Sequence, residues 1–273
     1  MGNGAAGDRQ GNATAQASNV TIAVTRGFEL ARMTWIEVES LLTADTIVVI
    51  PLGAAAKEHG PHLPLNTDWL QAEYLKNKVL ADADVVVAPP ITYNYFPAFL
   101  EYPGSTSLSF ETARDMVQEI CESLGRHGPR RFYVLNYGVS TNTPLQAAAN
   151  SLTGKGYLLH FTDLTKAPAG SNKITKLQQR GTHADIGETS IMLFIAPERV
   201  DMSKAVKDCN ASQGAGGLTR EPTATSSVYS PTGVWGDATL ANAEHGAQLV
   251  AELMQAILDD IELLRNTPLP ERQ

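Results

Sequence analysis

Cysteine is scarce in this 273-residue chain, which contains only Cys121 and Cys209. Neither has a second cysteine at the spacing of a zinc ribbon, so the sequence argues against a thiolate metal site. Two cysteines in a chain of this length do not suggest a disulfide framework either. Cys121 lies among Val117, Ile120 and Leu124, and we therefore expect it to be a small, buried apolar residue.

Long apolar runs are missing as well, and so is an excess of positive charge. No apolar segment approaches the ~18–20 residues that a helix needs to span a bilayer. The formal net charge of −8 argues against nucleic acid and anionic membranes as partners. We expect a small-molecule substrate and no membrane association.

Three common catalytic signatures are also absent. The sequence has no GxxxxGKS or GxxxxGKT loop, no GxGxxG after a predicted strand, and no GxSxG nucleophile elbow. The sequence therefore predicts neither a phosphate-binding loop of the first two types nor a serine nucleophile of the third.

The first 19 residues have almost no apolar side chains and are rich in Gly, Asn, Ala, Gln and Ser. Such a segment cannot bury enough surface to offset the entropy of ordering, so residues 1–19 are predicted to be a disordered tail. The tail lacks the charged start and apolar core of a signal peptide. We expect a cytoplasmic protein; the alternative is an exported protein whose signal has been removed.

The rest of the chain alternates between strand and helix patterns. Thr34 and Glu37 form a capping box that opens a short helix ending at Leu42. Residues 166–180 are predicted to lie at the surface, and residues 210–236 to form an extended loop. β-Branched runs and apolar residues at helical spacing give the other elements: strands 46–51, 85–88, 131–136 and 157–161, and helices 67–82, 110–127, 143–153, 188–196 and 239–265.

This alternation, with short connections, predicts an α/β fold. Its central sheet should be mostly parallel and covered by helices on both faces. No internal repeat and no change in composition divides the sequence, so residues 20–273 are predicted to form a single domain.

A cluster of histidines and carboxylates follows the first predicted strand: Glu58, His59, His62 and Asp68. Imidazole nitrogen and carboxylate oxygen suit zinc, manganese or iron. Open α/β sheets place their chemistry in the loops after the strands, which favours a metal or catalytic site here. A structural reading stays open, in which His59 is a hydrogen-bonded polar group and Lys57 and Glu58 are a solvated pair.

A second polar cluster contains His183, Asp185 and Glu188, and an apolar run, 191–195, follows it directly. Residues beside such a run are not expected to be ordinary surface residues. A long aromatic loop, 91–109, is equally consistent with covering a neighbouring element or lining a site.

Four segments in order resemble the creatininase family of metal-dependent amidohydrolases. Residues 59–68 read HGPHLPLNTD, 103–108 read PGSTSL, 183–190 read HADIGETS, and 230–237 read SPTGVWGD, with Leu240 and Ala241 following. The resemblance covers nearly the whole chain from about residue 30. It implies an αβα sandwich, often assembled as a homohexamer, that hydrolyses C–N bonds of cyclic or formyl amides at a one- or two-metal centre.

The first departure from the family pattern is at Lys57. The family usually reads Glu-x-His-Gly, in which Glu and His are both ligands, whereas here Lys57 stands two residues before His59 and Glu58 stands beside it. Adjacent side chains of a strand point to opposite faces. Glu58 could therefore join His59 on a metal only through a β-bulge, and one extra residue after Gly53 would provide it.

The second departure is in residues 136–142, which read NYGVSTN where the family has Asn-Gly-His-Gly-Gly-Asn with a ligand His. In two-metal members the missing Glu and the missing His bind the same metal. The other metal would use the counterparts of His59 and Asp68 together with an acid, which could be Glu188. The resemblance thus implies a one-metal derivative, or one in which the Lys57 ammonium replaces the lost cation.

The resemblance makes a metal-dependent hydrolase of a small cyclic amide the leading prediction. One zinc or manganese ion per chain would lower the pKa of a water molecule and polarise the carbonyl. The expected metal ligands are Glu58, His59, Asp68 and Glu188. His183 would carry a proton to the leaving nitrogen, Asp185 would orient His183 or the metal, and Lys57 would supply positive charge.

Two other functions stay open. Lys57 and Ser140 could form a metal-free Ser–Lys pair, since a desolvated lysine can act as a base. Alternatively, the chain could be a non-catalytic, ligand-binding member, although the retained His59, Asp68, His183 and Glu188 argue against this. Because family members commonly associate, we also predict a homo-oligomer, a hexamer, in which the aromatic loop offers apolar contact area.

Overall fold

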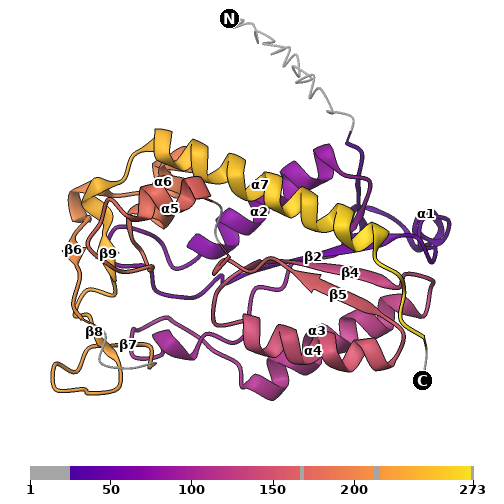
Figure 1. Cartoon of the computed structure of the whole chain (residues 1–273), viewed down its shortest axis with the longest axis horizontal. Helices are drawn as coiled ribbons and strands as arrows, with labels where there is room; N and C mark the ends of the chain where they lie inside the picture. The colour runs from indigo at the N-terminus through magenta and orange to yellow at the C-terminus, as the bar shows by residue number, and fades with distance from the viewer. Residues whose placement is uncertain (1–24, 167–168, 212–215, 272–273) are drawn as a thin grey trace, which may run out of the picture.

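The computed structural model describes residues 25–166, 169–211 and 216–271, and the predicted disordered tail lies outside these ranges. The chain has the predicted α/β architecture, in which a central parallel sheet lies between two helical layers (Figure 1). Among the described residues, no helix is both long enough and apolar enough to cross a bilayer.

The central sheet has five strands in the order β1-β3-β2-β4-β5, and every neighbouring pair is parallel. The sheet places β5 at one edge, with only β4 beside it. The bounds of the strands are β1 (Phe28–Glu29), β2 (Ile47–Gly53), β3 (Val86–Val87), β4 (Arg131–Tyr137) and β5 (Leu158–Phe161).

The helices form two layers. In Figure 1, α2, α5, α6 and α7 lie above the sheet, and α3 and α4 lie below it. The short α1 lies to one side and has no buried residue. The bounds of the helices are α1 (Trp35–Glu39), α2 (Thr67–Asp82), α3 (Phe110–Gly125), α4 (Asn142–Gly154), α5 (Ala169–Thr175), α6 (Ile186–Ile195) and α7 (Ala243–Asn266).

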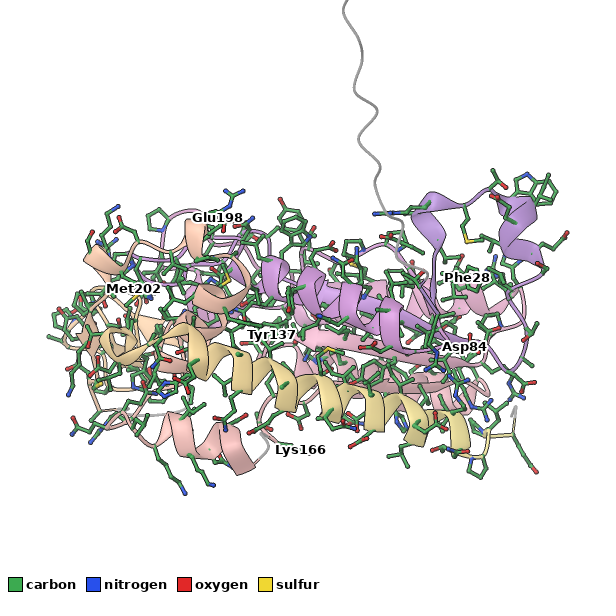
Figure 2. All side chains as sticks on the ribbon, turned by 90° about the horizontal axis from the view of Figure 1, so that it is seen from above. Phe28, Asp84, Tyr137, Lys166, Glu198 and Met202 are labelled. Carbon is green, nitrogen blue, oxygen red and sulfur yellow. The ribbon has the colours of Figure 1, made fainter. Side chains whose placement is uncertain are left out.

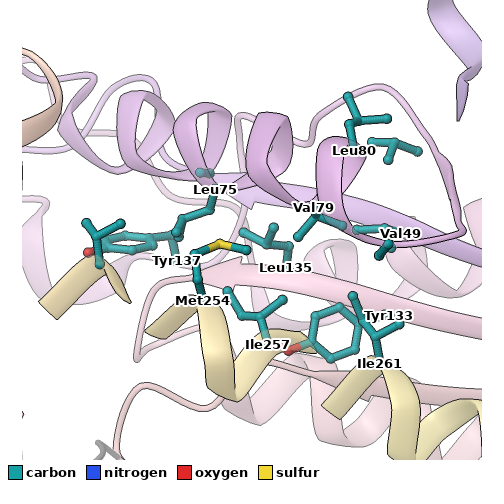
Figure 3. Close-up of a cluster of buried hydrophobic side chains, with 14 of the residues drawn as sticks. Val49, Leu75, Val79, Leu80, Tyr133, Leu135, Tyr137, Met254, Ile257 and Ile261 are labelled. Atoms are coloured by element: carbon teal, nitrogen blue, oxygen red, sulfur yellow. The ribbon is translucent and has the colours of Figure 1, made fainter. Parts of the chain in front are cut away.

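All seven residues of β2 are buried, as its unbroken apolar run predicts for a central parallel strand. Alternate side chains serve opposite faces: Ile47 and Val49 join the core under α2 and α7, whereas Val48 and Ile50 join the core over α3 and α4. Figure 3 shows the first core, in which Met254 of α7 lies with residues of α2 and the sheet. Each such side chain contributes about 1.5–3 kcal/mol when fully buried.

Side-chain caps explain where several helices begin. The predicted capping box is confirmed, because the Thr34 hydroxyl accepts from the Glu37 N–H while the Glu37 carboxylate accepts from the Thr34 N–H. Helix α6 begins at Ile186 rather than 188, because the Asp185 carboxylate accepts the first N–H groups. Helix α7 begins at Ala243 rather than 239, because Asn242 caps it.

The sequence missed some short elements. The predicted surface stretch 166–180 contains α5, and the predicted loop 210–236 contains two two-residue strands and the first residue of a third. These strands are too short to give a periodic pattern, so their partners define them. Strand β7 (Leu218–Thr219) pairs with β8 (Val228–Tyr229), and β9 (Gly236–Asp237) pairs with β6 (Lys207–Asp208). Cys121 is fully buried, as predicted.

Candidate metal centre

The two predicted polar clusters meet at the carboxyl end of the sheet. Strand β2 ends at Gly53, and the chain then turns before α2 begins at Thr67. The second cluster is brought over this turn by an antiparallel bridge, in which His183 and Trp235 exchange backbone hydrogen bonds of 3.1 and 2.9 Å. Ala184, next to His183, has φ 47°, a left-handed conformation that is uncommon for alanine and often found at functional sites.

Asp68 contacts two other residues of the first cluster, His59 and Lys57. Its Oδ1 lies 2.7 Å from His59 Nε2, and its Oδ2 lies 2.7 Å from Lys57 Nζ. The Lys57 contact is an ion pair rather than an aligned hydrogen bond, since Oδ2 has no well-oriented donor among the described residues. Burial raises the pKa of Asp68, but the charges of Lys57 and His59 outweigh it and lower this pKa to about 2. Asp68 is therefore ionised.

Lys57 is a buried cation. Burial lowers its pKa, but the Asp68, Glu188 and Glu58 charges outweigh burial and raise it overall. The ammonium also lies 4.7 Å from the centre of the Phe99 ring, where the ring quadrupole favours a cation. Lys57 therefore stays charged and cannot serve as a free base.

His183 links the second cluster to the first. Its Nε2 lies 2.7 Å from Glu58 Oε1 and 3.1 Å from the Glu58 carbonyl oxygen, and its Nδ1 lies 3.5 Å from Glu188 Oε2. Burial lowers the pKa of His183, but the hydrogen bond to Glu58 and the charges of Glu188 and Glu58 raise it overall. Both ring nitrogens thus face carboxylates.

The hydrogen-bond geometry of His59 requires a cation. Its Nδ1 lies 2.9 Å from the carbonyl oxygen of Lys57, which can only accept, so Nδ1 must donate. The Nε2 of a neutral ring then faces the ionised Asp68 carboxylate, and two acceptors at 2.7 Å need either a proton between them or a metal ion bound close to both. A histidine whose other nitrogen donates to a carbonyl is also the usual arrangement at metal sites.

The net charge of the cluster also indicates that it needs additional positive charge. Three carboxylates surround one ammonium, which leaves an excess of two negative charges before the two imidazoles are counted. One divalent ion would neutralise that excess, and so would protonation of both imidazoles. The groups concerned are Glu58, Asp68 and Glu188, with Lys57, His59 and His183.

Three of these residues could hold a metal ion together. One ligand atom from each of His59, His183 and Glu188 lies within 4.8 Å of the others. The predicted ligands Glu58 and Asp68 lie beside this set, each in contact with one of its histidines. The donor set of two imidazoles and a carboxylate fits zinc or manganese. The geometry thus makes His183 a candidate ligand, whereas the resemblance implied a role in proton transfer.

The expectation that Glu58 needs a β-bulge was wrong, because residues 57–59 do not belong to a strand. Strand β2 has already ended at Gly53, so alternation does not constrain these side chains. Lys57 and His59 both face Asp68, while Glu58 faces His183 and accepts the Gly60 N–H at 2.8 Å.

Asp185 has a different surrounding from the one predicted. Its carboxylate accepts the Gly187 and Glu188 N–H groups at 2.8 and 3.1 Å and the Gln178 amide at 2.7 Å. Burial and the Glu188 charge raise its pKa to about 6. Among the described residues, its carboxylate has no hydrogen bond or ion pair with the side chains of His183 and Glu188. Its contact with the Glu188 N–H fixes the start of α6 and hence the position of Glu188.

His62, part of the first cluster, is a buried neutral side chain. Its Nε2 lies 2.8 Å from the Thr189 hydroxyl, and its Nδ1 has no partner among the described residues. Burial lowers its pKa to about 4. His62 therefore joins the first loop to α6 without carrying charge.

The turn 136–142 is held by hydrogen bonds. The Asn136 amide donates to the Gly138 carbonyl, to Asn142 and to the Thr162 carbonyl at 2.8–3.2 Å. Ser140 is half-buried, and among the described residues no hydrogen bond joins it to Lys57, whose ammonium pairs with Asp68.

Sequence reasoning missed Tyr137, which it assigned only to the turn. Tyr137 is the last residue of β4; its ring is buried beside Leu75 and Met254 (Figure 3), yet it lines the same cavity as Lys57 and Asp68. In Figure 2 it lies between the Phe28 end of the molecule and the Met202 end. Its hydroxyl has no hydrogen-bond partner among the described residues. Residues 133, 135 and 137 alternate along β4 and therefore share one face of the sheet. This pattern could have predicted that Tyr137 is buried with Tyr133 and Leu135.

Burial raises the pKa of Tyr137 well above its usual value, and the charges of Glu188, Asp68 and Asp185 raise it further. The phenol is thus a neutral donor at the edge of the cluster.

The cluster opens into a cavity of about 1630 Å³. Part of the aromatic loop lines it: Phe96 and Phe99 form its wall, and the Phe99 ring lies 4.5 Å from the His183 ring. The lining role weighed for this loop is therefore confirmed for these residues.

Comparison with known proteins identifies similar chains. The family model "Creatininase: Creatinine amidohydrolase" matches residues 31–261. A creatinine amidohydrolase of Pseudomonas putida is 29% identical over 199 residues, which are 65% of this chain and 75% of the relative. A mycofactocin precursor peptide peptidase of Mycolicibacterium smegmatis is 28% identical over 222 residues, 79% of this chain and 84% of the relative.

Solved structures agree with the fold. A structure described as "Creatininase Mn" is 25% identical and superposes with a TM-score of 0.75, covering 88% of this chain and 100% of that one. A creatininase variant described as "Zn-Zn type" is also 25% identical, with a TM-score of 0.72, covering 88% of this chain and 98% of that one. These similar proteins contain manganese and zinc, the two metals predicted from the sequence.

Proposed function

The chain belongs to the creatininase family, and we propose on this basis that it is a metal-dependent hydrolase of an amide C–N bond. The named relatives act on creatinine and on a precursor peptide. An amide C–N bond is the feature that these two substrates share, so we propose this bond class, with a small cyclic amide as one candidate substrate.

The single observation that carries the proposal is the pair of facing acceptors, His59 Nε2 and Asp68 Oδ1, 2.7 Å apart and fully buried. We propose that one zinc or manganese ion binds here through His59, His183 and Glu188, with Asp68 beside it. When bound, such an ion would acidify a water molecule and polarise a carbonyl group.

The surrounding residues would then have distinct tasks. Glu58 holds His183 through a 2.7 Å hydrogen bond, whereas Asp68 Oδ1, 2.7 Å from His59 Nε2, would place a carboxylate charge beside the ion. The Lys57 ammonium, kept charged by Asp68, would stabilise negative charge that develops on the substrate. The Tyr137 hydroxyl would donate a hydrogen bond to the substrate oxygen, because the phenol stays neutral.

The test combines metal analysis with activity. Purified protein is analysed for metals per chain, dialysed against a chelator, and reloaded with Zn²⁺ or Mn²⁺. Each form is assayed with creatinine, N-formyl amino acids and short peptides. We expect one ion per chain, activity in the loaded forms, and loss of activity on chelation. Full activity in metal-free protein would overturn the proposal.

The metal-free Ser–Lys alternative has less support, because Lys57 pairs with Asp68 and stays protonated. A non-catalytic, ligand-binding protein is a different alternative, supported by the fact that Lys57 and two protonated imidazoles could balance the cluster by themselves. Persistent failure to bind any divalent ion would favour this reading.

A further inference from the structure

The free edge of β5 offers unpaired backbone groups. Leu158, which begins this strand, donates its N–H to the carbonyl of Arg130, just before β4, and Thr162, just after the strand, donates its N–H to the carbonyl of Val134. Because backbone groups alternate in direction along a strand, the N–H and C=O groups of Leu159 and Phe161 point away from the sheet. Among the described residues, none of these four groups has a partner.

This edge lies inside the cavity of the candidate metal centre. The lining of that one cavity of about 1630 Å³ includes Lys57, Asp68 and Glu188 at the centre and the whole of β5. Gln146 and Asn150 of α4 line one side of the strand, and Leu253 and Asp260 of α7 line the other. The cavity exceeds the roughly 300–1,000 Å³ typical of small-molecule sites, so a small cyclic amide would leave most of it empty.

The edge is too recessed for an ordinary strand-to-strand dimer. Leu159 is 5% exposed and Leu158, His160 and Phe161 are partly buried, since α4 and α7 flank the strand. In a second copy of this chain, β5 would be equally recessed between its own helices, so the two edges could not meet. A single extended chain is narrow enough to enter.

We propose that this groove binds an extended peptide as an added strand along β5, with an amide bond of that peptide placed at the metal centre. Main-chain hydrogen bonds to Leu159 and Phe161 would bind any sequence. The centre follows β2, and β4 and β5 separate β2 from a strand added beside β5. Beyond the carboxyl end of β5, the peptide would therefore cross the end of β4 to reach the centre, within the same cavity. At ~3.3 Å per residue, four to five peptide residues span β5 and its end.

This inference rests on the proposed hydrolase function and specifies its substrate class. In the reaction, the oxygen of water bonds to the acyl carbon, the C–N bond breaks, and a proton goes to the leaving nitrogen. The added strand contributes only positioning, which concerns binding and can be measured without turnover.

The experiment uses fluorescein-labelled peptide amides of randomised sequence, with two, four, six and eight residues. Their binding to the full-length protein is measured by fluorescence anisotropy, with and without chelator. We expect affinity to rise with length to about six residues and then level off. Peptides N-methylated at alternate residues should bind roughly 3–10-fold more weakly, because each lost hydrogen bond costs about that much.

Phe161→Pro is the matching change in the protein. Proline removes only the outward N–H of residue 161, because this group takes no part in the β4 ladder. Phe161→Ala loses the same ring but keeps the N–H. We expect roughly 3–10-fold weaker binding of the long peptides to the proline variant than to the alanine variant, with equal binding of dipeptides. If the proline variant does not fold, the binding of the N-methylated peptides to the unmodified protein tests the main-chain hydrogen bonds instead.

Three outcomes are distinguishable. If binding is independent of peptide length while short amides are hydrolysed, peptide binding along β5 is overturned and the hydrolase function is retained. If binding depends on peptide length but no peptide or short amide is hydrolysed, peptide binding along β5 is retained and the hydrolase function is overturned. If sedimentation shows that Phe161→Pro dissociates an oligomer that Phe161→Ala leaves intact, the edge is a contact between copies and the inference is overturned.

Discussion

At the scale of single residues, the candidate centre is defined by which atoms face one another. Sequence spacing identified His59, Asp68, His183 and Glu188, and the structure brings all four to one place. Spacing could not say that Lys57 pairs with Asp68, since that contact depends on the turn between β2 and α2. Nor could it separate ligands from their hydrogen-bond partners, because both need the same residue types.

The first residue-scale prediction concerns metal affinity. We expect His59→Ala and Glu188→Gln to lose stoichiometric binding of Zn²⁺, because each removes a proposed ligand. Asp68→Asn should weaken binding roughly 10–100-fold, as expected for loss of a charged group beside the ion that is not one of the three ligands. The measurement is titration calorimetry of chelator-treated protein. His127→Ala, which changes an exposed histidine outside the cluster, is the control. Unchanged binding in His59→Ala would rule out this centre.

The second prediction concerns Tyr137. If its free hydroxyl donates to the substrate oxygen, Tyr137→Phe should lower kcat roughly 10²–10³-fold while leaving KM and metal content nearly unchanged. Tyr133→Phe is the matched control on the same strand, because the Tyr133 hydroxyl bonds Thr162 and the Tyr133 side chain does not line the cavity. An equal loss of kcat in both variants would show that Tyr137 acts only through packing.

The third prediction concerns pH and His62. Its pKa of about 4 lies below the unfolded value of ~6.5, so the unfolded chain binds the proton more readily. Stability from this group is therefore complete above pH 6.5 and is lost as pH falls towards 4. At pH 4.5 we expect a loss of about 2 kcal/mol in the free energy of unfolding by urea. His62→Gln, which can still hydrogen-bond Thr189, should reduce this acid sensitivity; an identical pH profile would assign the loss to other groups.

At the scale of helices and strands, most of the central fold could be predicted. The buried strand β2 and the helices α2, α3 and α4 each carry a clear apolar pattern and lie within a few residues of their predicted positions. The short strands β6 to β9 could not be found, because two residues carry no periodicity and their pairing depends on distant partners. Helix starts were displaced where a single capping side chain, such as Asp185 or Asn242, decides the boundary.

Gly53 leads to an element-scale prediction. A Cβ at this position would lie 2.5 Å from the backbone oxygen of Asp68 and 2.9 Å from the Ala72 side chain. Gly53→Ala should therefore push the start of α2 away from β2 and displace Asp68. We expect weaker metal binding by at least roughly tenfold. Gly154→Ala is the control, because a Cβ there meets nothing within 4 Å, and its metal affinity should be unchanged. Normal metal affinity in Gly53→Ala would show that the helix adjusts without moving Asp68.

At the scale of the whole molecule, two neighbouring exposed apolar side chains lie on α1, outside the lining of the cavity. Helix α1 has no buried residue, yet it exposes 74% of Trp35 and 64% of Ile36. A five-residue helix of this kind is not stabilised by its own sequence. Neighbouring exposed Trp and Ile side chains are typical of a surface that contacts another chain.

We therefore predict that the protein is a homo-oligomer, a hexamer, in which α1 forms part of a subunit contact. Trp35→Ser combined with Ile36→Ser should lower the sedimentation coefficient at micromolar concentration, because two apolar anchors leave the interface. Leu263→Ser removes a similarly exposed side chain, 59% exposed, from α7 and serves as the control. Circular dichroism checks that each variant is folded. A wild-type monomer would contradict the assembly, whereas an intact oligomer in the double variant would place the contact elsewhere, such as on the aromatic loop, where Tyr93 is 51% exposed.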